Sequence, residues 1–236
     1  ARLTKEDTAF EIGPGTGMLT RELLRLAGKV IAIETDHELF EKLQMDFAYE
    51  IHEGRLELIH GDIRTYPINT AIAVSFGYQV VANIPYYLTG EILRMFLGAE
   101  NQPKSMTLLV QKEVAERVAR SKKESILSLS IKAYGTPKYE FTVPRGAFKP
   151  APKVDSAVLT IRDISRKNFS TNSCTSLTCA EKRFFELLNA GFAHKRKFVR
   201  SNLAEAGFPQ GDIPLKARAE DLPLSTWLEL ARSSEV

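Results

Sequence analysis

Residues 83–86, Asn-Ile-Pro-Tyr, place an amide, a rigid bend and an aromatic ring directly after an apolar run. An exocyclic amine of a nucleobase is a poor nucleophile because its lone pair is delocalised into the ring. The Asn83 side-chain oxygen and the Ile84 carbonyl could accept the two amine protons and free that lone pair. Pro85 would fix the bend, and Tyr86 would stack a flipped base. The simpler interpretation is a strand-ending turn, in which proline stops the ladder and tyrosine covers the core.

A glycine-rich turn is the second candidate for chemistry. Gly13, Gly15 and Gly17 follow the apolar run TAFEI and precede a helical pattern. Glycines at such a turn let the backbone approach a ligand, and the following helix offers unpaired N–H groups at its start. The dinucleotide fingerprint requires glycine where this sequence has Met18, so NAD fits poorly. A tight strand-to-helix turn without any ligand would use the same glycines.

Two carboxylates end the next two apolar runs. Glu34 follows Gly13 by about 20 residues, where an acid can accept both hydroxyls of a ribose. Asp62 could accept from an adenine amino group, with Ile63 as an apolar wall. Either acid alone could equally cap the helix that follows it. At successive strand ends of one sheet, the two acids together favour a crevice that binds a nucleoside.

The elements that must position these residues are visible as alternating patterns. Short apolar runs alternate with helical stretches up to about Glu113, and they lie at 8–12, 29–34, 56–60, 78–83 and 105–111. This alternation predicts an α/β fold with a mostly parallel sheet covered by helices on both faces. In residues 126–143 and 154–163, apolar and polar side chains alternate, and a proline-rich loop separates the two segments. This pattern predicts strands added antiparallel at the sheet edge.

The composition of the chain changes after these predicted strands. We expect a catalytic domain over 1–165, a polar, Ser/Thr-rich linker over 166–177 and a small all-helical domain over 178–236. Cys174 and Cys179 lie in the polar stretch without histidines nearby, so we expect two free thiols and no metal site.

Composition excludes several classes of protein. The hydrophobic share of 44% and charged share of 26% are ordinary for a globular protein, and no apolar run approaches the roughly 20 residues of a membrane span. The first residues have no signal or transit character, so we expect a cytoplasmic protein. A net charge of +3 does not by itself indicate nucleic-acid binding. The basic run HKRKFVR at 194–200 has a solvated helix face as its ordinary interpretation.

Separated motifs of this sequence resemble the ribosomal RNA adenine N6-dimethyltransferase family. They are EIGPGTG, the two acids, NIPYYLTGEIL, LLVQKEVAERV at 108–118 and AFKPAPKVDSAVL at 147–159. The resemblance implies a Rossmann-like class I methyltransferase sheet that binds S-adenosylmethionine (AdoMet) at Gly13, Gly15, Gly17, Glu34, Asp62, Ile63 and Asn83. It also implies that Asn83, Pro85 and Tyr86 receive the target amine and base. Phe148 would hold the other face of a flipped adenine, although composition alone indicates a core anchor.

Within this family the sequence is most similar to the bacterial small-subunit type. That similarity implies dimethylation of two adjacent adenosines near the 3′ end of 16S rRNA, with the small-subunit precursor as partner and no membrane, by a protein that we expect to be monomeric. The RNA phosphates would be contacted by Lys149, Lys153, Lys195, Arg196, Lys197 and Arg200. Lys149 and Lys153 could equally be solvated loop lysines.

Three alternatives stay open at this point. The first is a 23S rRNA methyltransferase of the macrolide-resistance type, which shares NIPY and the proline-rich motif. The second is a methyltransferase that acts on another amine, in DNA or protein. The third is a ribosome-assembly or transcription factor that keeps only the fold.

The family resemblance also implies a basic segment with a Q-x-F-L motif before the glycine loop, closing over the methionine end of AdoMet. Gly13 lies so near the first residue that the sequence as given has no room for this segment. We therefore expect weaker AdoMet affinity than in a longer form that carries it. Calorimetric titration of both forms tests this, and equal dissociation constants would contradict it.

Overall fold

A computed structural model of the chain describes residues 1–68, 77–170 and 177–232. Its contacts divide the chain into two compact units. The first contains residues 1–115 and 138–164, and the second contains residues 116–137 and everything from 165 onward. The helical unit therefore draws on a segment from the middle of the sequence in addition to the expected C-terminal part.

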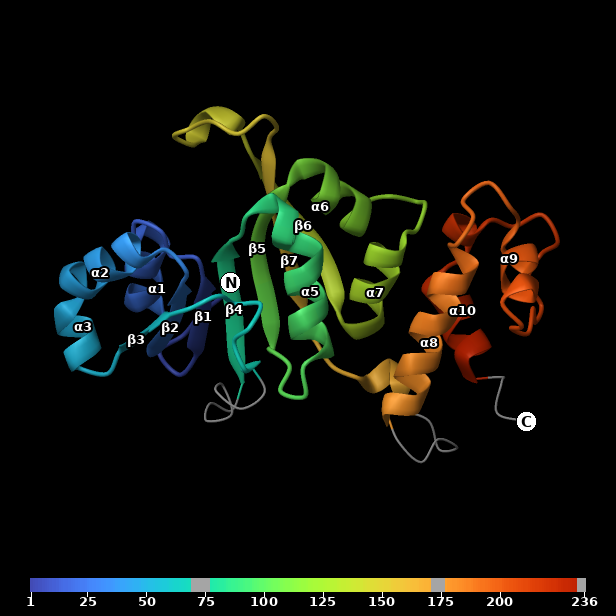
Figure 1. Cartoon of the computed structure of the whole chain (residues 1–236), viewed down its shortest axis with the longest axis horizontal. Coiled ribbons are helices and arrows are strands. Elements are labelled where there is room, and N and C mark those ends of the chain that lie inside the picture. The colour runs from blue at the N-terminus through green and yellow to red at the C-terminus, as the bar shows by residue number, and fades with distance from the viewer. Residues whose placement is uncertain (69–76, 171–176, 233–236) are drawn as a thin grey trace. The chain divides into compact units, whose positions relative to one another are not determined.

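The first unit is built on a seven-stranded sheet with the order β3-β2-β1-β4-β5-β7-β6 (Figure 1). The strands are β1 Thr8–Ile12, β2 Lys29–Glu34, β3 Leu56–His60, β4 Tyr78–Asn83, β5 Ser105–Gln111, β6 Thr136–Val143 and β7 Ser156–Arg162. β1 to β5 pair in parallel, and β7 pairs antiparallel with β5. The predicted α/β fold with an antiparallel edge is confirmed, and β1 to β5 begin and end at the predicted residues.

Helices cover both faces of this sheet. They are α1 Met18–Leu26, α2 His37–Asp46, α3 Ala48–His52 and α5 Thr89–Gly98, and helix α6 (Lys112–Ala119) begins in this unit and continues into the second. Ala9 of β1 belongs to a buried cluster with Leu23 of α1, while the next residue, Phe10, contacts Phe96 of α5 with ring centroids 5.6 Å apart. Successive side chains of a strand point to opposite faces, so these contacts place α1 and α5 on opposite sides of the sheet.

The prediction of a strand over 126–134 is wrong, because these residues form helix α7 (Ile126–Tyr134). The Ser125 hydroxyl accepts from the Ser128 N–H at 3.1 Å, and the Ser128 hydroxyl accepts from the Ser125 N–H at 2.7 Å. This capping box pairs backbone donors that would otherwise lack partners at a helix start. The alternation of leucine and serine in this segment is typical of a strand. Because α7 is buried on most of its faces, its polar residues do not recur with the 3.6-residue period of a surface helix.

The second unit packs its helices around aromatic side chains. Its further helices are α8 Leu177–Gly191, α9 Val199–Glu205 and α10 Leu224–Arg232. Phe169 lies in the short 3-10 helix η3 (Lys167–Phe169). Its ring centroid is 5.3 Å from that of Tyr134 and 5.5 Å from that of Phe184. This part of the expected linker is therefore packed into the core of the helical unit.

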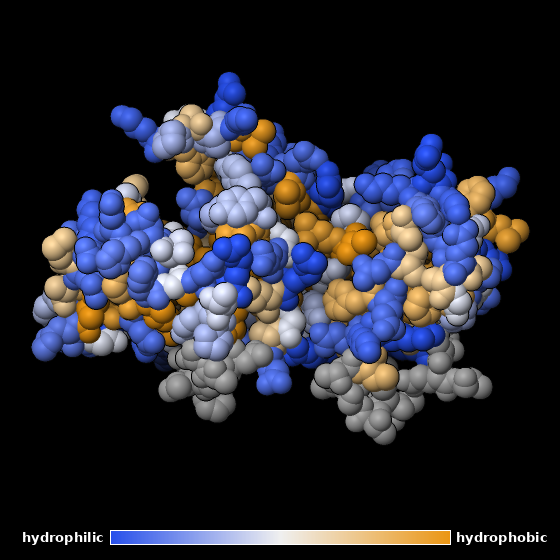
Figure 2. Space-filling model, viewed as in Figure 1, coloured by the Kyte–Doolittle hydropathy of each residue, from blue (hydrophilic) through white to orange (hydrophobic). Residues whose placement is uncertain are grey.

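The surface of the protein is mostly polar. In Figure 2 the visible face is mostly hydrophilic, with apolar residues showing in separate patches. Cys179 is an exposed free thiol in the first turn of α8 instead of a loop, and Cys174 lies outside the described residues. Within the described parts of the chain, we find neither a helix that could cross a membrane nor a group of three metal-binding side chains.

Candidate active site

One edge of the sheet collects the residues that the sequence singled out. Strands β1 to β4 run parallel, so their carboxyl ends lie together. This edge carries the glycine loop after β1, Glu34 at the end of β2, Asp62 and Ile63 just after β3, and residues 83–86 at the end of β4. The fold thus brings segments that are far apart in the sequence to one side of the sheet.

The glycine loop requires glycine at each of its three positions. Gly13, Gly15 and Gly17 have φ values of 64°, 59° and 79°, which side chains with a Cβ adopt only with strain. At Gly17 an added Cβ would also lie 2.6 Å from the Phe47 side chain. At Gly13 and Gly15 it would meet nothing within 4 Å. The open space beside these two glycines leaves room for a ligand against the backbone.

Glu34 ties the glycine loop to the start of α2. Its carboxylate is almost fully buried, with one oxygen accepting from the Gly15 N–H at 2.9 Å and the other from the Thr35 and Asp36 N–H groups at 2.9 and 3.0 Å. A carboxylate has about four acceptor positions, so capacity for one further donor remains. Asp36, in contrast, is the cap of α2 and accepts from the Leu39 N–H.

Glu11 is a buried acid of β1, two residues before Gly13, that is not among the predicted site residues. It is 1% exposed, and its Oε2 atom has no hydrogen-bond partner in the structure. Burial raises the pKa of Glu11 to about 7, the nearby Thr20 hydroxyl opposes that rise, and the negative charge of Glu34 adds to it. An acid inside the apolar run TAFEI is the signal that could have identified it. An unpaired buried acceptor next to this loop fits a ligand that brings an N–H donor.

Asp62 is held by a residue that the sequence reasoning missed. The Arg64 side chain donates from Nε to both carboxylate oxygens at 3.0 Å, and the Arg64 backbone N–H donates at 2.9 Å. These hydrogen bonds keep the pKa of Asp62 below its usual range, so the carboxylate is an ionised acceptor at neutral pH. The neighbouring Ile63 is only 5% exposed and packs mainly into the interior.

The segment 83–86 turns sharply as it leaves the sheet. Asn83, the last residue of β4, is exposed, whereas Ile84 is 2% exposed and anchors the segment in the core. Pro85 has φ −55° and ψ 133°, and its carbonyl accepts from the Leu88 N–H at 3.0 Å. This bend leads directly into the one-turn 3-10 helix η1 (Tyr86–Leu88). The amide of Asn83 is therefore presented to solvent beside a backbone that its neighbours fix.

Tyr86 is positioned by a long-range hydrogen bond. Its hydroxyl lies 2.6 Å from the Ser156 Oγ atom, and Ser156 is fully buried at the start of β7. The ring itself is half-buried, while the adjacent Tyr87 is 82% exposed. Ser156 was not among the predicted site residues. Its only signal in the sequence is a serine at the start of an apolar strand, which is too common to identify it.

The loop between β6 and β7 carries the other predicted aromatic. It projects beyond the end of the sheet (Figure 1), and Phe148 follows the short 3-10 helix η2 (Arg145–Ala147) in a half-buried position. The described residues show no ring contact between Phe148 and Tyr86. Lys149 and Lys153 are exposed on the same loop. Two rings that hold a base between them do not touch each other, so the role of Phe148 stays a prediction.

The basic run lies in a turn and at the start of α9, within the second unit. Lys197 forms an ion pair with Glu205 at 2.6 Å. Arg200 donates to the Gln210 side chain at 3.0 Å and to the Ile213 carbonyl at 3.3 Å. Lys195 and Arg196 are exposed, and neither has a carboxylate partner in the described parts of the chain. The predicted set thus separates into two cations that stabilise the turn and two that are available to a ligand.

Comparison with known proteins gives concordant matches. A family model described as ribosomal RNA adenine dimethylase matches residues 1–232. Proteins named ribosomal RNA small subunit methyltransferase A from Dehalococcoides mccartyi and Crocosphaera subtropica are 38% and 37% identical, each over 98% of this chain and over 79% and 89% of their own lengths. A solved dimethyladenosine transferase from Plasmodium falciparum is 25% identical, with a TM-score of 0.77 over 98% of this chain and 90% of that one.

Proposed function

Because this chain belongs to the ribosomal RNA adenine dimethylase family, we propose that it methylates the N6 amines of two adjacent adenosines near the 3′ end of 16S rRNA. The observation that carries the proposal is the convergence of the glycine loop, Glu34, Asp62 and residues 83–86 at one sheet edge. Relatives named for the small subunit favour 16S over 23S rRNA as the substrate. The protein would act as a cytoplasmic monomer on a precursor of the small subunit.

Family membership confirms the resemblance seen in the sequence motifs and, with it, the class of AdoMet-dependent methyltransferases. When bound, AdoMet supplies a methyl group on a positively charged sulfur. The open space beside Gly13 and Gly15 and the unpaired Oε2 of Glu11 fit such a ligand. Glu34 and Asp62, with Ile63 beside them, would hold its ribose and adenine, and Asn83 would border the reacting methyl group.

The acceptor amine would be activated by two oxygens from this chain. Asn83 Oδ1 and the Ile84 carbonyl would accept hydrogen bonds from its two N–H groups, so that its lone pair is less delocalised into the ring. Tyr86 would stack the flipped base, and Phe148 would cover its second face. A neutral amine can attack without prior deprotonation, and it loses its proton during or after methylation. This explains why the site needs hydrogen-bond acceptors but no strong base.

RNA affinity would come from cations outside the pocket. Lys149 and Lys153 on the β6–β7 loop and Lys195 and Arg196 before α9 are exposed. Phosphate contacts of this kind position the RNA, while the pocket selects the base. We assign Lys197 and Arg200 to holding the turn in its binding conformation, since both are engaged with neighbouring side chains.

The decisive experiment is methyl transfer from labelled AdoMet to 30S subunits from a strain that lacks the modification, followed by mapping of the methylated bases. We expect label on two adjacent adenosines near the 3′ end of 16S rRNA. Methylation of isolated 23S rRNA, with 30S subunits unlabelled, would overturn the substrate assignment. Absence of transfer to any RNA by a form that binds AdoMet would favour the assembly-factor alternative.

A further inference from the structure

The helical unit contains a cavity of about 480 Å³ that the proposed methyl transfer does not use. Its walls come from three segments that are separate in sequence, namely residues 117–127, 191–197 and 218–220. All three segments belong to the second unit, so the cavity is complete within that unit. A cavity of this size falls in the range of small-molecule and cofactor sites, about 300–1,000 Å³.

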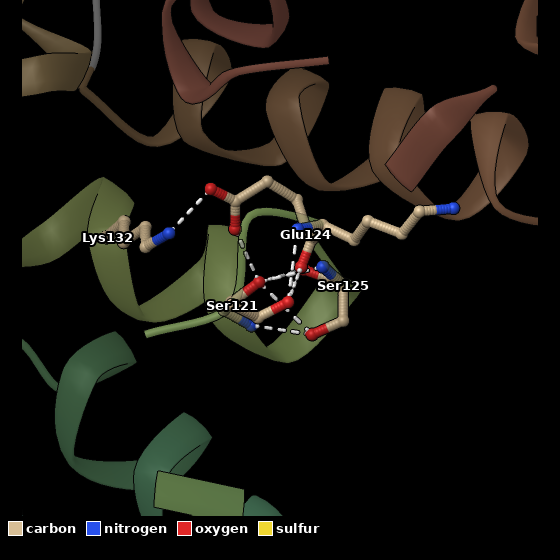
Figure 3. A network of polar contacts seen from close by, with 6 residues as sticks. Ser121, Glu124, Ser125 and Lys132 are labelled. Atoms are coloured by element: carbon tan, nitrogen blue, oxygen red, sulfur yellow. Dashed lines mark hydrogen bonds and ion pairs between the residues drawn. The ribbon is translucent and has the colours of Figure 1, made fainter. Parts of the chain in front are cut away.

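The first wall is fixed by a polar network around Glu124 (Figure 3). One oxygen of the Glu124 carboxylate forms an ion pair with Lys132 at 2.5 Å, and the other accepts from the Ser128 hydroxyl at 2.7 Å. The Glu124 N–H donates to the Glu220 carbonyl at 2.7 Å, which joins this wall to the third segment. The Lys123 ammonium adds an ion pair with the Glu220 carboxylate. These bonds hold two of the three segments together.

The second wall is fixed from behind by buried residues. Asn202 of α9 is 3% exposed and donates from Nδ2 to the Gly191 and His194 carbonyls at 2.7 and 3.2 Å. A Cβ at Gly191 would lie 2.3 Å from the Trp227 ring, so only glycine allows this approach. Phe192 stacks on Trp227 with ring centroids 5.7 Å apart and planes 25° from parallel. The cavity is therefore pre-formed, and a ligand need not order its walls.

The lining combines positive charge with apolar surface. The charged lining residues are Arg117, Lys123, Glu124, Lys195, Lys197, Arg218 and Glu220. Both acids are already in ion pairs, and Lys197 pairs with Glu205. The side chains of Lys195 and Arg218 form no ion pair within the described residues, and the Arg218 backbone N–H donates to the Asp221 carboxylate at 3.2 Å. Between these charges lie Ile126, Leu127 and Phe192, of which Ile126 is 38% exposed although it is aliphatic. Cations beside apolar side chains match a ligand with a phosphate and a planar base.

We propose that this cavity binds a nucleotide of the substrate RNA other than the methylated adenosine, with its base against Ile126 and Phe192 and its phosphate at Lys195 and Arg218. That the nucleotide belongs to RNA rests on the proposed function, whereas nucleotide binding itself rests on the cavity alone. An unpaired nucleotide held here would provide a second anchor point. The enzyme would then recognise the fold of the RNA as well as the target adenine.

The first test uses mononucleotides without AdoMet or RNA. The full chain, with labelled isoleucine methyl groups, is titrated with AMP, GMP, CMP and UMP, and the chemical shift of Ile126 is followed by NMR. We expect saturable shifts at Ile126 and smaller changes at Ile31, which is buried in the sheet unit. Adenosine without phosphate should bind at least about tenfold more weakly, because charge-assisted hydrogen bonds are lost. The absence of a saturable shift at Ile126 with all four mononucleotides would overturn the proposal.

Two matched double variants test whether nucleotide binding depends on the position of the cations or only on the net charge of the unit. Lys195→Ala with Arg218→Ala removes two cations of the cavity, whereas Lys122→Ala with Lys216→Ala removes two exposed cations of the same unit that do not line it. The first pair should weaken AMP binding about tenfold or more, and the second should leave it within about twofold. Equal losses in the two pairs would mean diffuse electrostatic attraction and would contradict a built site.

The second test identifies the source of the nucleotide. Unmethylated 30S subunits with 4-thiouridine in their rRNA are irradiated with the protein, and crosslinked peptides are mapped. Crosslinks to the peptide that contains Phe192, reduced by the Lys195 and Arg218 changes, support an RNA nucleotide. Mononucleotide binding without such crosslinks would overturn the RNA assignment in favour of a free nucleotide. Neither measurement depends on methyl transfer, so both can succeed even if the proposed reaction fails.

Discussion

The two halves of the candidate active site are held in different ways. In the cofactor half, Glu34 is buried and receives three backbone N–H groups, and the glycine loop folds directly against it. In the acceptor half, Asn83 is exposed, the Tyr86 hydroxyl pairs with Ser156, and the Tyr86 carbonyl accepts from the Thr89 hydroxyl at 3.0 Å. The first half is stabilised by hydrogen bonds from its own backbone. The second half is held by contacts to buried residues such as Ser156, and its Asn83 side chain faces solvent.

Under the proposed function, this difference follows from what each half would bind. A cofactor of constant shape is held best by a loop that is already formed. The conformational entropy of that loop is then lost when the protein folds and does not reduce the affinity for the cofactor. A base that must leave its helix requires an open site with few fixed contacts. The comparison predicts that changes in the cofactor half affect stability and ligand affinity together. Changes in the acceptor half should affect methyl transfer alone.

The largest effect should come from Glu34→Ala. Removing this carboxylate leaves the Gly15, Thr35 and Asp36 N–H groups without their acceptor, which should lower the free energy of unfolding by roughly 3–5 kcal/mol. AdoMet affinity should fall in parallel, since the glycine loop loses its tie. Urea unfolding and calorimetric titration measure the two effects. A stable Glu34→Ala protein with lost AdoMet affinity would show that the two functions of Glu34 are separable.

Asn83→Ala should give the opposite profile. The side chain is exposed and lies at a strand end, so the free energy of unfolding should change by less than about 0.5 kcal/mol. The catalytic rate should fall about 10²–10³-fold, by analogy with the loss of one pre-organised hydrogen-bonding group at a reacting centre. Single-turnover methylation and thermal unfolding are the measurements. Transfer at the parental rate would refute the role assigned to Asn83.

Glu11→Gln tests the cofactor half through pH. Burial raises the pKa of Glu11 from 4.5 to about 7, so the folded state holds this proton more tightly than the unfolded state. The resulting stability is complete below pH 4.5 and is lost as the pH rises to about 7. Glutamine stays neutral at every pH, so the variant should exceed the parent by about 3 kcal/mol at pH 8 and match it near pH 4.5.

Urea unfolding across this pH range provides the measurement for Glu11. Glu22→Gln is the control, because Glu22 is an exposed carboxylate on α1 with a surface ion pair to Arg25. This control should keep the parental pH dependence. A Glu11→Gln protein whose stability falls with rising pH as steeply as that of the parent would show that another group is responsible.

The cofactor half and the acceptor half also differ in how much of their structure the sequence predicts. The strands that carry the glycine loop and Glu34 are buried on both faces, so they appear as uninterrupted apolar runs with clear ends. The local spacing of the glycines then fixes the loop. The places of the glycine loop and Glu34 in the fold could therefore be predicted from the sequence, and the acid inside TAFEI was the one signal there that was not used.

The acceptor half and the helical unit depended on contacts between distant residues. Ser156 reaches Tyr86 only because β7 inserts between β5 and β6, and no local pattern fixes that strand order. Alternating leucine and serine in 126–130 fitted a strand as well as a buried helix, and only the Ser125 cap distinguishes them. Phe169 appeared to be one apolar residue in a polar linker until its packing against Phe184 was known.

The smallest predicted effect concerns the bond that supports Tyr86. Ser156→Ala or Tyr86→Phe removes one partner of the 2.6 Å hydrogen bond, which should cost about 1 kcal/mol. If the bond orients the ring for stacking, that cost appears as a several-fold rise in KM for RNA, with kcat and AdoMet affinity unchanged. The double variant should then resemble either single variant, since both changes remove the same interaction.

A fluorescent base sharpens this test of Ser156. With 2-aminopurine at the target position, stacking on Tyr86 should quench the emission of the flipped base in the parent and less so in both single variants. Ser156→Thr, which keeps a hydroxyl, should restore quenching if the buried strand accepts the extra methyl group. Parental quenching and KM in Ser156→Ala would show that the Tyr86 ring is held by packing alone. The acceptor half would then be as rigid as the cofactor half.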